Sequence, residues 1–430
     1  MTRPLLPALL GLFVVSGCFG PSQPPPEEDV VTVRRRANGL GKAPSPATAA
    51  TRGTGGVSQF LDPDTLAALT SGASGAVAVD PSVPTPAPPT GSAFPSIVPS
   101  TGLQLSFEEL TGQWGLRPYL SRPRAGHVAG AFKEALVVIE GDHRPSRETL
   151  EPGAERWSLD DSHDVQHGLK GEGFVLAQGL SLGVGAMAYD DSELWLAGGL
   201  AGLQNADGTQ GSAALHLYRH PEGYASARKD EAARSMTTGR YAAAGGVVGG
   251  TFVIAGGVAK PGQVVSRVEL VAIAGRAGAV DGPAMPVPVA GAASVVAQGR
   301  LYVLGGYTFT GGKPTPVDHV QVYDGTTGTW AKDGGSFAPA ALPAKLHGAA
   351  AAYVPETGVL YLAGGFDEAG NPLDTVYSFS LTAGDRWVAQ RPMPTARGLL
   401  SLTAFRGALW AIGGFGRERR ALQTVEVFQP

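Results

Sequence analysis

Short apolar runs that end in glycine recur along the chain from residue 105 onward. Each run is continuous rather than alternating, which favours a strand buried on both faces over a strand with one wet face. The glycine pair that follows permits a tight exit and a close approach of backbone. Five runs are clear, at 194–199, 252–257, 301–306, 360–365 and 409–414, and an earlier one at 136–141 is degenerate because Glu140 replaces the first glycine.

Each apolar run is the second strand of a repeating unit of four predicted strands. A strand of small residues precedes it, as in 242–248, and a third strand follows, as in 320–324. A glycine then leads to a tryptophan that opens the fourth strand, as at Trp330 and Trp387. The runs end 49 to 59 residues apart. A period near 50 residues indicates one propeller blade per unit, and the absence of long helical periodicity predicts an all-β fold.

The first and last units are incomplete in complementary ways. The last unit has strands over 399–405, 409–412 and 424–428, and then no fourth strand before Pro430. The segment 113–120 reads as a strand with no unit of its own. We predict that 113–120 pairs with the C-terminal blade and closes the ring, because closure removes exposed strand edges.

The double glycine, the strand that ends in Tyr323 and Asp324, and the tryptophan that follows together resemble the Kelch superfamily. The resemblance covers residues 105–430. It implies a Kelch-type β-propeller over 104–430 with six blades. Seven blades are the alternative, because the first unit is worn and units one to three lack the clean Tyr-Asp pair.

The N-terminal quarter of the chain has a different composition. Arg3, an apolar run over 5–15 and the sequence Val15-Ser16-Gly17-Cys18 resemble a bacterial lipoprotein signal, so we predict cleavage after residue 17 and acylation of Cys18. A plain secretory signal is the alternative. The Pro-, Gly- and Ala-rich stretch 18–103 reads as a flexible linker. Phe19 after the cysteine indicates the outer membrane, on its periplasmic side or at the cell surface, with the lipid as the only membrane contact.

Composition limits the classes of function. A net charge of −4 argues against a nucleic-acid partner, and a single cysteine excludes an intramolecular disulfide. The pattern G-x-S-x-G at 179–183 lies between two strands and not at a strand-turn-helix elbow, so it is not taken as a nucleophile. The cluster Asp160, Asp161, His163, Asp164 and His167 has metal-ligand chemistry, but a polar loop is the favoured interpretation. We predict no catalytic residue, no metal and no cofactor.

Basic residues gather on the loops and crossovers that the propeller topology brings to one face. Convergent cations, arginines above all, suit the capture of carboxylate or phosphate. The candidate ligand-binding residues are Arg124, Arg144, Arg240, Lys345, Arg397 and Arg417. The alternative is an ordinary solvated rim.

The function that these features favour is a membrane-anchored binding or scaffold module in the bacterial cell envelope. We expect a monomer whose partner is a protein or an anionic glycan. The alternative is a carbohydrate-active enzyme of the sugar-acid epimerase or mutarotase kind, since such enzymes occur among Kelch proteins. The chemistry of galactose oxidase, another Kelch relative, needs a cysteine cross-linked to tyrosine, and the only cysteine here is the predicted acylation site, Cys18.

Overall fold

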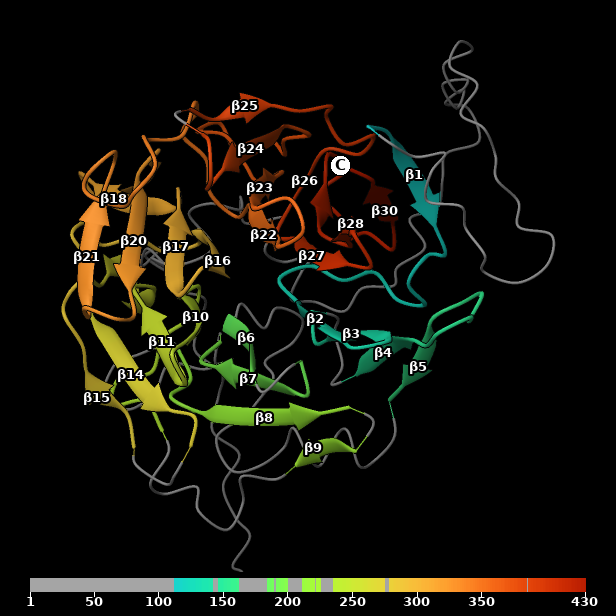
Figure 1. The fold of residues 1–430 in the computed structure, drawn as a ribbon, viewed down its shortest axis with the longest axis horizontal. Helices are drawn as coiled ribbons and strands as arrows, with labels where there is room; N and C mark the ends of the chain where they lie inside the picture. The colour runs from blue at the N-terminus through green and yellow to red at the C-terminus, as the bar shows by residue number, and fades with distance from the viewer. Residues whose placement is uncertain are drawn as a thin grey trace, which may run out of the picture. The chain divides into compact units, whose positions relative to one another are not determined.

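The chain is an all-β propeller in the part that the computed structural model describes, which comprises residues 112–141, 146–161, 184–188, 191–199, 211–220, 222–225, 235–274, 278–384 and 386–430. The regular elements of these residues are all strands, with no helix among them. They form six four-stranded sheets and three two-stranded sheets (Figure 1). The predicted signal over 1–17, Cys18 and the predicted linker over 18–103 lie outside the described residues.

Five four-stranded sheets are each contributed by one contiguous stretch of chain. Sheet 1 contains β2 (Val128–Phe132), β3 (Ala135–Ile139), β4 (Arg147–Leu150) and β5 (Ser158–Asp160). Sheet 2 contains β6 (Val184–Ala188), β7 (Glu193–Ala197), β8 (Leu215–Arg219) and β9 (Gly223–Ala225). Sheet 3 contains β10 (Ala244–Val248), β11 (Thr251–Ala255), β14 (Val268–Ala272) and β15 (Val280–Asp281). Sheet 4 contains β16 (Ala293–Ala297), β17 (Arg300–Leu304), β20 (Val320–Asp324) and β21 (Thr329–Lys332). Sheet 5 contains β22 (Ala350–Val354), β23 (Val359–Ala363), β24 (Val376–Ser380) and β25 (Val388–Ala389).

The sixth sheet is a composite of the two ends of the propeller. It contains β27 (Ser401–Phe405), β28 (Ala408–Ile412) and β30 (Val425–Phe428), and its outer strand is β1 (Trp114–Arg117). The register of β1 against β30 runs from Trp114 opposite Phe428 to Arg117 opposite Val425. The segment 113–120, which was predicted to pair with the C-terminal blade, thus supplies the fourth strand of that sheet (Figure 1).

The innermost strands follow one another around a common axis. Each contacts the next in the order β2, β6, β10, β16, β22, β27 and back to β2. Three short two-stranded sheets accompany this ring. Two are hairpins, β12 (Val258–Lys260) with β13 (Gln263–Val264) and β18 (Tyr307–Thr310) with β19 (Lys313–Pro316). In the third, β26 (Arg397–Gly398) of the crossover before sheet 6 pairs with β29 (Phe415–Gly416), and β29 begins the hairpin of sheet 6, which the Phe415–Ala421 bridge closes.

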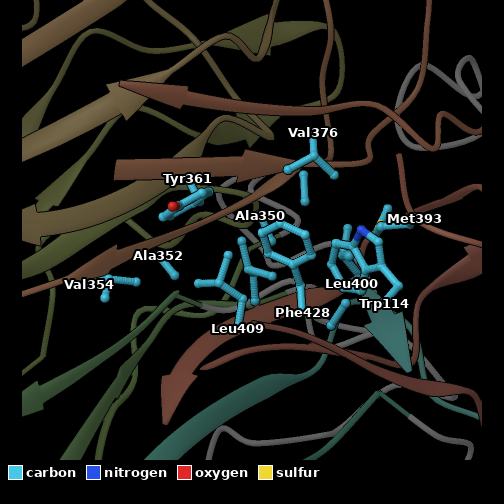
Figure 2. Close-up of a cluster of buried hydrophobic side chains, with 13 residues drawn as sticks. Trp114, Ala350, Ala352, Val354, Tyr361, Val376, Met393, Leu400, Leu409 and Phe428 are labelled. Atoms are coloured by element: carbon cyan, nitrogen blue, oxygen red, sulfur yellow. The ribbon is translucent and has the colours of Figure 1, made fainter. Parts of the chain in front are cut away.

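The core lies between neighbouring sheets and not within any one of them. Figure 2 shows the cluster between sheets 5 and 6, where Trp114 and Phe428 lie together among side chains from both sheets. Their ring centroids are 5.2 Å apart. In β28, Leu409 belongs to this cluster, whereas the next residue, Trp410, belongs to the cluster on the opposite side of the sheet. Successive side chains of a strand point to opposite faces, so a second strand flanked by two cores must be apolar at every position.

The glycine pairs are required by close contacts at the ends of these apolar strands. Gly364 has φ +67°, and a Cβ there would lie 2.4 Å from the carbonyl oxygen of Arg397. Gly365 has φ +102°, and its Cβ would lie 2.8 Å from the oxygen of His347. In the degenerate first copy, Glu140 occupies the first position with φ +67° and accepts the left-handed backbone that glycine takes elsewhere.

A chain of backbone hydrogen bonds links the sheets close to the axis. Five positions at the entry to the first strands have a left-handed φ, and they are Gly126, Ala242, Gly291, Gly348 and Leu399. Gly126 N donates to Leu399 O, Leu399 N to Gly348 O, Gly348 N to Gly291 O and Gly291 N to Ala242 O, at 2.7–2.8 Å. Hydrogen-bonded backbones lie only about 5 Å apart. These hydrogen bonds therefore keep the backbone of the described residues close to the axis at the entry to the first strands.

Candidate functional site

An open groove of about 620 Å³ lies beside the hairpin of sheet 6. The crossovers between sheets meet these hairpins directly: Arg397–Gly398 pairs with Phe415–Gly416, and Tyr241 bridges Val258. Crossovers and hairpins therefore share one face, as the topology predicted. Arg417, one of the predicted ligand-binding residues, lines the groove with Arg420.

The N-terminal segment forms one wall of this groove. Tyr119 lines it and is 58% exposed. The next residue, Leu120, donates its N–H to Gln423 O at 2.9 Å. Gln423 Nε2 in turn donates to the carbonyls of Leu120 at 3.1 Å and Ser121 at 3.0 Å. The groove is therefore complete only when the segment that carries β1 is in place.

The charged side chains of the groove are exposed and loosely paired. Arg417 Nη2 lies 3.9 Å from Asp374 Oδ2, and Arg420 Nη2 lies 3.9 Å from Glu418 Oε2. All four side chains are between 42% and 80% exposed. Exposed ion pairs of this length contribute little to stability, so either guanidinium can exchange its partner for an anion in solution at small cost.

Three of the predicted ligand-binding arginines are buried beneath this face, and the expectation that they form an exposed cationic cluster is corrected here. Their side chains have no exposed surface, and each pairs with an almost fully buried glutamate on the third strand of its own sheet. The pairs are Arg124–Glu148 at 2.9 Å, Arg240–Glu269 at 2.8 Å and Arg397–Glu426 at 2.5 Å. Because a buried cation without a carboxylate would be costly, these arginines are structural.

The buried pairs fasten the crossovers to the sheets. Arg397 Nη1 donates to the carbonyls of Gly413 and Thr424, both at 3.0 Å, and Glu426 Oε1 accepts from Thr395 Oγ1 at 2.6 Å. Thr395 and Thr424 line the groove. Burial lowers the pKa of Arg397, and the negative charge of Glu426 opposes that shift. The buried pair therefore fixes Thr395 and Thr424, two residues that line the groove.

In sheet 4, uncharged groups take the place of the buried ion pair. Gln321 occupies the position of the glutamate and is fully buried. Its Oε1 accepts from Val287 N at 2.8 Å, and its Nε2 donates to Val287 O at 3.0 Å. The crossover before sheet 4 contains Val289 where sheets 1, 3 and 6 have arginine, so no charge is left uncompensated.

The remaining sequence candidates are dispersed. Lys345 is exposed on the crossover before sheet 5 and does not line this groove, and Arg144 lies outside the described residues. Of the acidic and histidine cluster, Asp160 pairs with Arg147 at 2.7 Å and Asp161 with Arg122, whereas residues 162–170 lie outside the described part.

Sequence reasoning missed two residues of the groove. Tyr119 was assigned only to the closing strand, and Asp374 was given no role. The available signal for Tyr119 was its place near the end of the predicted closing strand 113–120, where the chain must turn toward the first crossover. Asp374 reaches the groove from the neighbouring sheet, and no local pattern marks such a contact.

Within the described ranges, no group of three or more His, Cys, Asp or Glu side chains is arranged to hold a metal ion. The same part of the chain contains no helix long and apolar enough to cross a membrane.

Comparisons with known proteins agree with this geometry. The Kelch motif family matches residues 288–332, which extend from the crossover before sheet 4 to the end of β21. The solved structure of YjhT superposes with a TM-score of 0.56 at 14% identity, over 72% of this chain and 96% of that chain, which supports the fold alone. No curated protein matches the chain. The matched motif and the propeller arrangement together support a Kelch-repeat β-propeller.

Proposed function

We propose that the protein is a six-bladed, lipid-anchored binding module of the bacterial cell envelope that captures an anionic ligand in the groove beside β29. Each four-stranded sheet is one blade, and Cys18 is the anchor. The propeller supplies a rigid base, and loops displayed on such a base commonly carry binding residues.

The observation that carries the proposal is the pair of exposed guanidinium groups at the groove. Arg417 and Arg420 are 73% and 76% exposed, and both project from one short hairpin end. That end is held by backbone bonds from Gly416 N to Arg420 O at 3.0 Å and from Arg419 N to Gly416 O at 3.1 Å. Two forked donors on a fixed turn suit bidentate bonds to a carboxylate or phosphate.

The rest of the groove favours a sugar acid over a simple anion. Asp374 and Glu418 offer carboxylate oxygens that accept hydrogen bonds from hydroxyl groups. Tyr119 offers an exposed aromatic ring at the edge, which covers the apolar face of a ring-shaped ligand. A ligand that carries both a carboxylate and hydroxyl groups matches all of these side chains.

Titration with galacturonate, followed by calorimetry on the full chain, tests the proposal. Arg417→Gln and Arg420→Gln should each weaken binding at least tenfold, since a charge-assisted hydrogen bond is worth about 1.5–3 kcal/mol. Arg406→Gln is the matched control, because Arg406 is an exposed arginine that pairs with Glu134 and does not line the groove. Equal affinity in the wild type and the double variant would overturn the groove as the site.

The anchor is tested separately. Cys18→Ser should release the protein from the membrane fraction into the soluble fraction while galacturonate binding stays unchanged. Retention of the variant in the membrane fraction would contradict acylation at this position.

A further inference from the structure

A second groove of about 580 Å³ lies beside the hairpin of sheet 3. Its lining includes Thr238 from the preceding crossover, Lys260 and Gln263 from the hairpin, and Pro288 from the following crossover. Arg267, just before β14, also lines it, and its Nη2 pairs with Asp281 Oδ1 at 2.6 Å. Lys260 and Gln263 are both exposed.

The two grooves occupy the same position in the repeat. A constant offset of 157 residues relates sheet 3 to sheet 6, with no insertion from the crossover to the third strand. It places Lys260 where the sixth sheet has Arg417, and Gln263 where it has Arg420. A positive side chain therefore stands at the same point of both hairpins.

The support beneath the two grooves is also the same. Arg240 and Glu269, which correspond by this offset to Arg397 and Glu426, form a fully buried pair at 2.8 Å. Glu269 accepts from the backbone N–H of Thr237 at 2.8 Å and of Thr238 at 3.3 Å, so it holds the crossover that lines the groove. In both sheets, a buried and charge-compensated ion pair therefore supports the crossover beside the hairpin cation.

The two grooves lie on opposite sides of the axis. In the ring of inner strands, β10 of sheet 3 and β27 of sheet 6 are separated by two strands in either direction (Figure 1). Facing sheets pack about 10 Å apart, so sheets that are opposite in a ring of six are about 20 Å apart. Both grooves open on the face that carries the hairpins and crossovers.

We propose that the two grooves are half-sites for one elongated polyanion, an acidic oligosaccharide that crosses the face of the propeller. The inference rests on the proposed function and extends it from a single sugar acid to a polymer. A ligand of at least about 20 Å reaches both cations at once, and the second contact is then intramolecular, which raises affinity without new chemistry.

Binding of galacturonate and of its dodecamer to the full chain tests this inference. The dodecamer should bind the wild type one to one and at least tenfold more tightly than the monomer. Lys260→Gln and Arg417→Gln should each reduce dodecamer affinity toward that of the monomer. Lys313→Gln is the matched control, because Lys313 is an exposed cation on the hairpin of sheet 4 and lines neither groove. All variants should melt at the wild-type temperature, since the three side chains are exposed.

The outcomes separate the two proposals. If Lys260→Gln binds the dodecamer as tightly as the wild type while Arg417→Gln does not, the second half-site is refuted and the single groove stands. If Arg417→Gln leaves the binding of both probes unchanged, the groove of sheet 6 is not a site and both proposals fail. Equal losses in Lys313→Gln and Lys260→Gln would indicate unspecific attraction to the basic face, which also overturns the half-site.

Discussion

Replacement of Trp114 by alanine is the most direct perturbation of ring closure. Trp114 is 8% exposed, its ring lies 5.2 Å from Phe428, and its Nε1 donates to Arg391 O at 2.9 Å. Burial of a tryptophan removes up to about 250 Å² from water, and truncation of a core tryptophan costs about 3–5 kcal/mol. The hydrogen bond adds about 1 kcal/mol. For a domain of this size, 1 kcal/mol shifts the melting temperature by about 2 °C, so Trp114→Ala should lower it by about 8–12 °C.

The assay is thermal unfolding followed by calorimetry, with Leu116→Ala as the control on the same strand. Leu116 is 57% exposed, so its truncation should change the free energy of unfolding by less than about 0.5 kcal/mol. Deletion of 104–121 should abolish folding, whereas deletion of 19–95 should leave the melting temperature nearly unchanged. Equal effects of the two alanine variants, or equal tolerance of the two deletions, would refute closure as a source of stability.

Two further predictions concern buried charge. Arg397→Met leaves Glu426 buried without its partner and should lower the free energy of unfolding, measured with denaturant, by about 3–5 kcal/mol. Lys345→Met is the control and should leave this free energy unchanged, because Lys345 is exposed. A loss of ligand binding without a loss of stability in Arg397→Met would instead make Arg397 a ligand contact. Burial lowers the pKa of His127 to about 3 and of His347 to about 4. The unfolded chain therefore binds protons below about pH 6.5 that the native state does not, and each histidine should remove about 2 kcal/mol of stability between pH 7 and pH 5. An unchanged denaturation midpoint over that range, or an equal slope in His347→Gln, would contradict these assignments.

The repeat architecture could be predicted because its causes are local. A strand between two cores must be apolar on both faces, and runs such as 409–412 display that requirement within four residues. The glycine pair after each run likewise indicates, within two residues, that another backbone segment lies close by. The pairing of 113–120 with the last blade followed from counting strands, since an unpaired strand at one end matched a missing strand at the other.

The site could be predicted only in part, because burial of a charge depends on residues distant in sequence. Arg397 and Arg417 are both cations on one face of the ring, and nothing in their immediate neighbours separates them. Arg397 is buried because Glu426, on the third strand, compensates its charge, whereas Arg417 has only a long contact to Asp374 of the adjacent sheet. The sequence by itself determined the strands, their repeat and the end that closes the ring. The tertiary structure decided which arginines hold the propeller together and which face solvent, because desolvation is set by the packing of whole sheets and not by local pattern.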